Sequence, residues 1–167
     1  MNPWIMGGIF LALVMVGMAK TIKQSNGSDG SVTQGGALIP LSVLSQAIAR
    51  AEGYYAAGSK AQRYNNPGNI YTSGGAVYAT FPTPEAGFQA LEDNIRRYNS
   101  GSWISPLVTT WRDLAWMWVN GTAPGAADSR GMGDNPDAWL AIIQADIAGK
   151  TGIFIDPMGD FRSDVAF

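Results

Sequence analysis

The sequence predicts a mainly helical α+β domain with a small β-hairpin, preceded by one N-terminal transmembrane helix. Three observations indicate this class. Apolar residues recur at helical spacing in several stretches between Pro40 and Ile147. The pair Gly74-Gly75 separates two short runs that contain Tyr and β-branched residues, as in a hairpin. A third run, from Trp4 to Ala19, is apolar on all sides and contains no charged residue.

The N-terminal run has the composition of a membrane anchor. Its length is at the short limit of a bilayer span. Trp4 at one end and Lys20 and Lys23 at the other suit the two membrane interfaces. A signal peptide cleaved after Gly17-Met18-Ala19 is the alternative, but no positively charged side chain precedes the run. We expect residues 1–23 to be an uncleaved single-pass anchor that contacts the lipid bilayer through residues 4–19.

The remaining chain divides into a linker, a domain and a tail. Residues 24–37 are rich in Gly, Ser, Asn and Asp, which predicts a flexible linker. Residues 38–153 contain the periodic apolar segments and form the expected domain. Residues 154–167 show few regular patterns, and we expect a C-terminal tail there.

Four helices are predicted within the domain from their first residues. Pro at the first position after Thr83 or Asn135 is a typical helix start, and the stretch from Thr110 to Asp113 resembles a capping box. The four helices are expected to open at Pro40-Leu41-Ser42, Thr83-Pro84-Glu85, Thr110 to Asp113 and Asn135-Pro136-Asp137. Gly53 ends the first, so that Glu52 lies on its last turn, and Gly149 or Gly152 ends the last.

The buried faces of these helices follow from apolar periodicity. They are expected to consist of Val43, Leu44, Ala47, Ile48 and Ala51 in the first helix, Phe88, Leu91, Ile95 and Tyr98 in the second, Leu114 and Trp118 in the third, and Trp139, Leu140, Ile142, Ile143 and Ile147 in the last.

Composition excludes many kinds of chemistry. The chain has no His and no Cys, so it lacks the residues of a Ser-His-Asp triad, a thiol nucleophile and a His-ligated zinc site. The formal charge is −2, without a basic cluster, which argues against nucleic-acid binding. No cofactor motif is present, and we expect no cofactor or metal. Asp and Glu remain for acid–base chemistry.

Glu52 is the candidate acid among three glutamates. It lies at a predicted helix C-terminus beside Tyr54 and Tyr55, where the helix dipole and partial desolvation both raise a carboxyl pKa. A glycosidic general acid needs such a raised pKa. Glu85 is expected to stabilise the first turn of its helix, and Glu92 to pair with Arg96 on the surface.

An amide-rich turn, Asn65-Asn66-Pro67-Gly68-Asn69-Ile70, follows Glu52-Gly53. Together these two elements resemble the lysozyme superfamily. They are most similar to the soluble lytic transglycosylase branch and to phage-borne muramidases with an N-N-P-G-N turn. The stretch from Phe81 to Phe88 is similar to the next element of that group, and Asp134 to Leu140 to its late helix, with Trp139 where Tyr is more usual. The resemblance spans roughly Leu41 to Ile153.

The resemblance implies a lysozyme-like fold with a cleft that binds peptidoglycan glycan strands. It implies that Glu52 acts as general acid and then base, and that Asn69 lines the cleft. Asn65 and Asn66 contact substrate or only form the turn, since Asn-Pro and Pro-Gly are turn sequences themselves. Tyr54 and Tyr55 contact substrate or belong to the core. The expected substrate-binding residues are Asn65, Asn66, Asn69, Tyr54, Tyr55 and Trp139, with Trp103 as a further candidate for sugar stacking.

The expected activity is cleavage of the bond between N-acetylmuramic acid and N-acetylglucosamine. Hydrolysis normally uses two carboxyl groups, whereas a lytic transglycosylase can use one, because the 6-hydroxyl of the sugar attacks the anomeric carbon. The next acidic residue after Glu52 that could serve as a partner, Asp93, lies in a predicted helix, which favours the transglycosylase. A hydrolytic muramidase using Asp128 or Asp134 is the main alternative. A catalytically silent lysozyme-fold virion protein and a membrane scaffold that binds proteins are the others.

The expected location follows from Lys20 and Lys23. By the positive-inside rule these lysines would keep the domain on the cytoplasmic side of a cell membrane, away from the wall. The internal membrane of a phage virion removes this contradiction, because an enzyme there acts during infection. Other virion proteins are then further expected partners. The bacterial cell envelope is the other location considered.

Overall fold

The described part of the chain is a mainly helical unit. A computed structural model describes residues 37–72, 77–101, 108–121 and 135–167. The helices are α1 (Leu41–Ala51), α2 (Lys60–Arg63), α3 (Pro84–Ser100), α4 (Trp111–Asn120), α5 (Pro136–Thr151) and α6 (Phe161–Asp164), and the strands are β1 (Ile39–Pro40) and β2 (Val165–Ala166). The mainly α class is thus confirmed.

The expected anchor and almost all of the expected linker, residues 1–36, lie outside the described residues. Within the ranges that the structure does describe, no helix is long and apolar enough to cross a membrane. The membrane anchor therefore stays a prediction.

The predicted helix starts are confirmed. The Thr83 and Thr110 hydroxyls each accept a hydrogen bond from a backbone N–H of the following turn, and Asp113 completes the capping box of α4. The Asn135 side chain accepts from two backbone N–H groups at the start of α5. At the other end of α5 it is Gly152, with φ 73°, that forms the C-cap.

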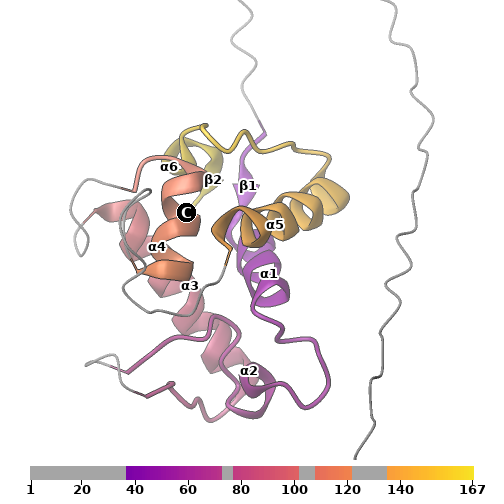
Figure 1. Ribbon diagram of the computed structural model, residues 1–167, viewed down its shortest axis with the longest axis vertical. Coiled ribbons are helices and arrows are strands. Elements are labelled where there is room, and N and C mark those ends of the chain that lie inside the picture. The colour runs from indigo at the N-terminus through magenta and orange to yellow at the C-terminus, as the bar shows by residue number, and fades with distance from the viewer. Residues whose placement is uncertain (1–36, 73–76, 102–107, 122–134) are drawn as a thin grey trace, which may run out of the picture. The chain divides into compact units, whose positions relative to one another are not determined.

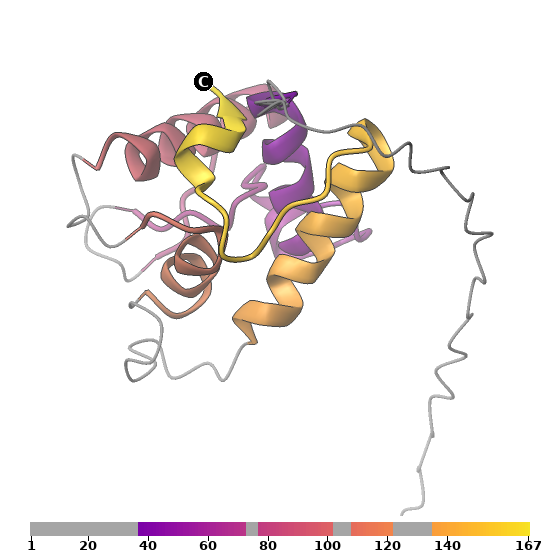
Figure 2. The same ribbon diagram turned by 90° about the horizontal axis from the view of Figure 1, so that it is seen from above.

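The core lies where α1, α3, α4 and α5 meet. Helix α5 runs along α1 and also packs on α4, while α3 packs on α1 (Figures 1 and 2). The predicted buried faces are largely confirmed, although Val43, Ala51 and Phe88 are only partly buried and Ile142 is 42% exposed. Fully buried side chains at the centre include Leu44, Ile48, Leu91, Ile95, Trp111, Leu114, Ile143, Ile147 and Phe161.

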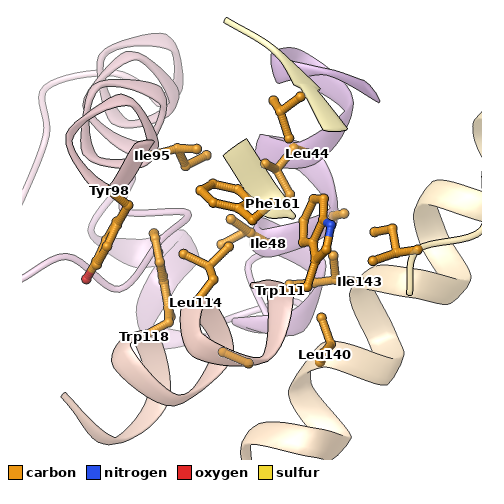
Figure 3. Packing of buried hydrophobic residues seen from close by; sticks show 14 of the residues in the cluster. Leu44, Ile48, Ile95, Tyr98, Trp111, Leu114, Trp118, Leu140, Ile143 and Phe161 are labelled. Atoms are coloured by element: carbon orange, nitrogen blue, oxygen red, sulfur yellow. The ribbon is translucent and has the colours of Figure 1, made fainter. Parts of the chain in front are cut away.

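The segment 154–167 is not a tail, which corrects the prediction. Phe161 is fully buried and packs edge to face on Trp111, with ring centroids 5.0 Å apart (Figure 3). Strand β2 pairs in parallel with β1, so that Val165 lies opposite Ile39. The elements here are too short to show periodicity, and their partners are distant in sequence. The domain therefore extends to the C-terminal residues.

The expected hairpin is present as one bridge. Tyr71 pairs with Tyr78 in the antiparallel sense, Thr72 N donates to Val77 O at 2.8 Å, and Ala79 N donates to Ile70 O at 2.8 Å. The Gly74-Gly75 turn lies outside the described residues. The short helix α2, which begins after the Ser59 N-cap, was not predicted, because four residues are too few to show a helical period.

Gly87 allows α3 to approach the turn at residues 65–69. A Cβ atom at Gly87 would overlap the backbone carbonyl of Asn65 and lie 2.9 Å from Pro67 Cδ. A backbone atom on one side and a proline ring on the other cannot move aside as a flexible side chain can. Glycine is therefore required here for its small size, because Gly87 is within a helix and not in a left-handed conformation.

We expect Gly87→Ala to lower the free energy of unfolding by at least about 2 kcal/mol, as overpacking typically does. Gly149→Ala is the matched control, because Gly149 is also helical and has no atom within 4 Å of the added Cβ. This control should be stabilised by about 0.5–1 kcal/mol. Denaturant unfolding of both variants measures the difference, and equal effects would contradict the role assigned to Gly87.

Candidate functional site

Glu52 lies where α1 ends. It is the C-cap of α1, with φ −80° and ψ 1°, and its backbone N–H donates to Ile48 O at 2.9 Å. Gly53 follows with φ 73°, a conformation that glycine adopts without strain, so the chain leaves the helix at once. The Glu52 side chain is therefore anchored on the last turn of a core helix, as predicted, and it is half-buried.

The turn from Asn65 to Ile70 contains two asparagines whose backbone is in the left-handed region. Asn65 has φ 49° and Asn69 has φ 47°, and they are the non-glycine residues with positive φ in the described part of the chain. Asn is among the few residue types that occupy this region readily. Asn at positions 65 and 69 therefore has a conformational reason that is independent of any substrate.

Asn66 holds the turn from inside. Its side chain is 1% exposed and makes three hydrogen bonds: Nδ2 donates to Ile70 O at 2.8 Å and to Ala79 O at 2.9 Å, while Oδ1 accepts from Ile70 N at 2.8 Å. This geometry contradicts the expected contact between Asn66 and substrate. The amide is used to link the turn to the segment after the hairpin.

Asn65 is also occupied by the protein, since its Nδ2 donates to Phe81 O at 3.0 Å. It is half-buried, and the bond fixes the start of the turn to the residues that lead into α3. Of the two roles considered for Asn65, the structure shows the turn-forming one. A contact with substrate stays a prediction.

Asn69 contacts Glu52 directly. Its Nδ2 donates to Glu52 Oε2 at 2.7 Å and lies 3.3 Å from the Glu52 backbone carbonyl oxygen. The short distance to the carboxyl oxygen is typical of a charge-assisted hydrogen bond. The left-handed backbone of Asn69 and its amide thus serve together, one shaping the turn and the other fixing the carboxyl group.

Trp139 contacts the other carboxyl oxygen. Its indole Nε1 donates to Glu52 Oε1 at 2.8 Å, although the residues are far apart in sequence. The Trp139 ring is buried and stacks on Trp118, with centroids 5.8 Å apart and planes 25° apart. Trp139 was expected to contact the sugar. The structure instead places its N–H on Glu52, and its burial leaves little ring surface for a sugar.

The two tyrosines after Glu52 differ. Tyr54 is buried and packs edge to face on Phe88, with centroids 5.4 Å apart, so it has the core position that was considered for it. Tyr55 is 51% exposed, and the Arg50 guanidinium lies 5.6 Å from its ring centroid. Tyr55 is accessible to a ligand, whereas the Tyr54 ring is largely covered.

Glu85 and Glu92 have the structural positions predicted for them. Glu85 is fully exposed on the first turn of α3, and hydrogen bonds from its own backbone N–H and from Thr83 lower the pKa of its carboxyl group. Glu92 pairs with Arg96 at 3.7 Å and lies 3.4 Å from the Ser45 hydroxyl, which donates to it.

The remaining carboxyl groups of the described residues bond elsewhere. Asp93 bonds to Gln89 and Arg96, Asp137 pairs with Arg112, and Asp146 pairs with Arg50 and Lys150; Asp113, Asp156 and Asp160 accept from backbone N–H groups, and Asp164 accepts from Trp111. Within the described ranges, no three acidic side chains gather as a metal site would require. Trp103, Asp128 and Asp134 lie outside these ranges.

The arrangement at Glu52 is a carboxyl group with an N–H donor on each oxygen. Both donors are held by rigid elements, Asn69 by the turn and Trp139 by α5. Sequence analysis identified Glu52 and Asn69, but it missed the bond from Trp139 and the support from Trp118, which had been predicted only as core. Apolar periodicity gives no sign of an indole N–H that bonds to a distant acid.

Comparisons with known proteins give no match: no protein-family model, no curated protein and no solved structure is similar to this chain.

We expect Asn66→Ala to destabilise the protein and Asn69→Gly to affect mainly its activity. Asn66→Ala leaves buried backbone groups without partners and should cost at least about 2 kcal/mol in denaturant unfolding. Asn69→Gly permits the positive φ and removes only the amide. The free energy of unfolding should fall by about 1–2 kcal/mol, from the lost hydrogen bond to Glu52 alone, since Gly adopts the positive φ without strain.

The cell-wall cleavage that the resemblance implies would separate these roles further. Asn69→Gly should lower turnover roughly tenfold to a thousandfold, the range for loss of one hydrogen bond at a reacting group. Asn65→Gly is the matched control, because it has the same backbone conformation and its amide bonds to Phe81 instead of Glu52. It should retain most activity. Equal losses in both variants would contradict a specific role for Asn69.

Proposed function

We propose that this protein cleaves the glycosidic bond between N-acetylmuramic acid and N-acetylglucosamine in peptidoglycan, with Glu52 as general acid and then base. One observation supports it most strongly: the Glu52 carboxyl group receives an N–H from Asn69 on one oxygen and from Trp139 on the other. A carboxyl group fixed in this way is held ready for proton transfer in one orientation.

The proposed reaction begins with proton donation. Glu52 gives its proton to the leaving glycosidic oxygen as the bond to the anomeric carbon breaks, and positive charge develops on the sugar. The carboxylate that results is stabilised by the N–H groups of Asn69 and Trp139. It then accepts the proton of the 6-hydroxyl of the muramyl residue. That oxygen bonds to the anomeric carbon, and the product is a 1,6-anhydro end.

We favour this lytic transglycosylase over a hydrolytic muramidase. A transglycosylase needs one carboxyl group, because the nucleophile is part of the sugar, whereas hydrolysis normally needs a second. The other acidic side chains in the described ranges are bonded to partners other than Glu52, Asn69 and Trp139. This supports the one-carboxylate route. Hydrolysis would have to use Asp128 or Asp134.

Among the glutamates, the contacts favour Glu52 as the acid. Glu85 is fully exposed on the first turn of α3, and its carboxyl group is bonded to its own backbone N–H and to the neighbouring Thr83, so no distant element of the fold fixes it. Glu92 is paired with Arg96. Glu52 instead lies between a turn and two stacked indoles, Trp139 and Trp118.

The proposal includes a membrane-bound location. If residues 1–23 anchor the chain, the internal membrane of a phage virion would carry the domain to the wall of the host cell during infection. Peptidoglycan and the lipid bilayer are then its partners, together with neighbouring virion proteins.

Replacement of Glu52 tests the mechanism. Glu52→Gln cannot exchange a proton, and loss of general acid catalysis costs about two to four orders of magnitude in rate. We expect almost no cleavage of purified cell walls in a zymogram or turbidity assay. A carboxamide can accept from only one of the two donors, so we also expect a loss of about 1–2 kcal/mol in unfolding free energy.

The controls are Glu85→Gln and Glu92→Gln, which remove the same charge at the surface and should retain most activity. An active Glu52→Gln protein would overturn the mechanism. An inactive wild-type protein that still binds cell walls would indicate a catalytically silent module.

The reaction products distinguish transglycosylase from hydrolase. We expect mass spectrometry of digested peptidoglycan to show 1,6-anhydro-muramic ends, whose mass is lower by one water than that of reducing ends. Digestion in ¹⁸O-labelled water is the control, because cleavage by hydrolysis incorporates the label at the new end and transglycosylation does not. Labelled reducing ends alone would establish the hydrolytic alternative.

A further inference from the structure

A second feature of the described surface is a hollow beside the turn. It has a volume of about 400 Å³ and is lined by Lys60, Tyr64, Tyr71, Val77, Tyr78 and Thr80. This volume is within the range of about 300–1,000 Å³ for small-molecule sites. These residues come from α2, from the residue after it and from the two sides of the bridge Tyr71–Tyr78. In Figure 1, α2 lies at the end of the domain opposite α6 and β2.

The lining of the hollow includes one positively charged side chain, that of Lys60. Lys60 Nζ lies 3.7 Å from the centroid of the Tyr78 ring, which is close enough for a cation–π interaction. The Tyr71 ring stacks on Tyr78 with centroids 4.4 Å apart and planes 28° apart. Two groups at such distances cannot share one face of a ring, so Tyr78 lies between Lys60 and Tyr71. The ammonium group is thereby held in place at the edge of the hollow.

The lining has the chemistry to bind an anionic sugar. The residues that line it include one ammonium group and no acidic side chain, so an anion is favoured. The Tyr64 and Thr80 hydroxyls can donate and accept hydrogen bonds as sugar hydroxyls require. Both faces of Tyr78 are covered, which leaves the half-buried Tyr64 ring as a surface for the C–H groups of a pyranose.

The chain connects this hollow directly to the Glu52 site. Tyr64 immediately precedes Asn65 and Tyr71 immediately follows Ile70, so two of the lining tyrosines flank the turn that places Asn69 on Glu52. Tyr64 O also accepts from Phe81 N at 2.9 Å, which fixes the wall of the hollow to the same segment that Asn65 contacts. A ligand bound here would therefore contact the elements that hold the turn.

We propose that this hollow is a second glycan-binding site that recognises a carboxylate-bearing muramyl unit, with Lys60 bound to the carboxylate and Tyr64 packed on the sugar ring. The identity of the ligand as peptidoglycan rests on the proposed function. The recognition of an anionic sugar rests on the lining residues alone.

The test compares two sugars that differ by one group. N-acetylmuramic acid has an ionised lactyl carboxylate, and N-acetylglucosamine lacks it. Each is titrated into the full chain in detergent micelles, and backbone amide shifts of residues 60–64 and 77–80 are followed by NMR. We expect N-acetylmuramic acid to bind more tightly at these residues. Lys60→Met should weaken its binding roughly two- to fivefold, the range of an exposed ion pair, and leave N-acetylglucosamine binding unchanged.

Arg97→Met is the matched control, because it removes one exposed positive charge at the end of α3, outside the hollow. It should bind both sugars as the wild type does. Tyr64→Leu should weaken the binding of both sugars, since the ring surface is lost in each case. Equal affinity of the wild type for the two sugars, or shifts confined to other residues, would overturn the proposal.

Wall cleavage is measured on the same samples, so that failure of the second binding site can be distinguished from failure of the proposed enzymatic function. A protein that cleaves cell walls but shows no preference for N-acetylmuramic acid would overturn the second site alone. A protein that binds N-acetylmuramic acid at residues 60–64 but does not cleave walls would support the second site and overturn the enzymatic function.

Discussion

The hydrogen bonds on the Glu52 carboxyl group join three segments that are far apart in the sequence. Glu52 ends α1, Asn69 belongs to the turn before the hairpin, and Trp139 lies in the first half of α5. Each bond alone would restrict one oxygen, but together they fix the plane of the carboxyl group. A fixed plane matters for proton transfer, because the reacting oxygen must lie within hydrogen-bond reach of the bond that breaks. The geometry of the site therefore depends on how accurately the domain places these segments.

That accuracy depends on contacts that do not touch Glu52. Gly87 lets α3 approach the backbone at Asn65, and Asn66 fastens the turn to Ile70 and Ala79 with buried hydrogen bonds. On the opposite side, the stack of Trp118 on Trp139 restricts the indole that donates to Glu52. Asn66 and Asn69 belong to one turn and are chemically identical, yet one amide is used for the fold and the other points to the acid. Residue type alone does not separate such roles, whereas burial and partners do.

The parts of this structure that were predicted from sequence are those with local causes. Helix starts at Thr83, Thr110 and Asn135 depend on hydrogen bonds within a few residues, so the signals are contained in the sequence itself. The same holds for Glu52 at the end of α1. What was missed depends on distant partners: the pairing of β2 with β1, the burial of Phe161, and the bond from Trp139 to Glu52. Ile142 shows a different limit of the sequence. Its helical spacing predicted a buried side chain, but no other described element packs over that position, and the side chain is exposed.

The N–H donors on Glu52 stabilise the ionised and the protonated forms of its carboxyl group to different extents. Asn69 and Trp139 can only donate through the N–H groups that face the carboxyl oxygens, so both stabilise negative charge there more than they stabilise the neutral acid. Their contribution grows as Glu52 loses its proton, which is the change that occurs when the leaving oxygen is protonated. Interactions that strengthen along the reaction lower its barrier, whereas those that are equal in both states do not. In the proposed mechanism the two donors are thus most useful during proton donation.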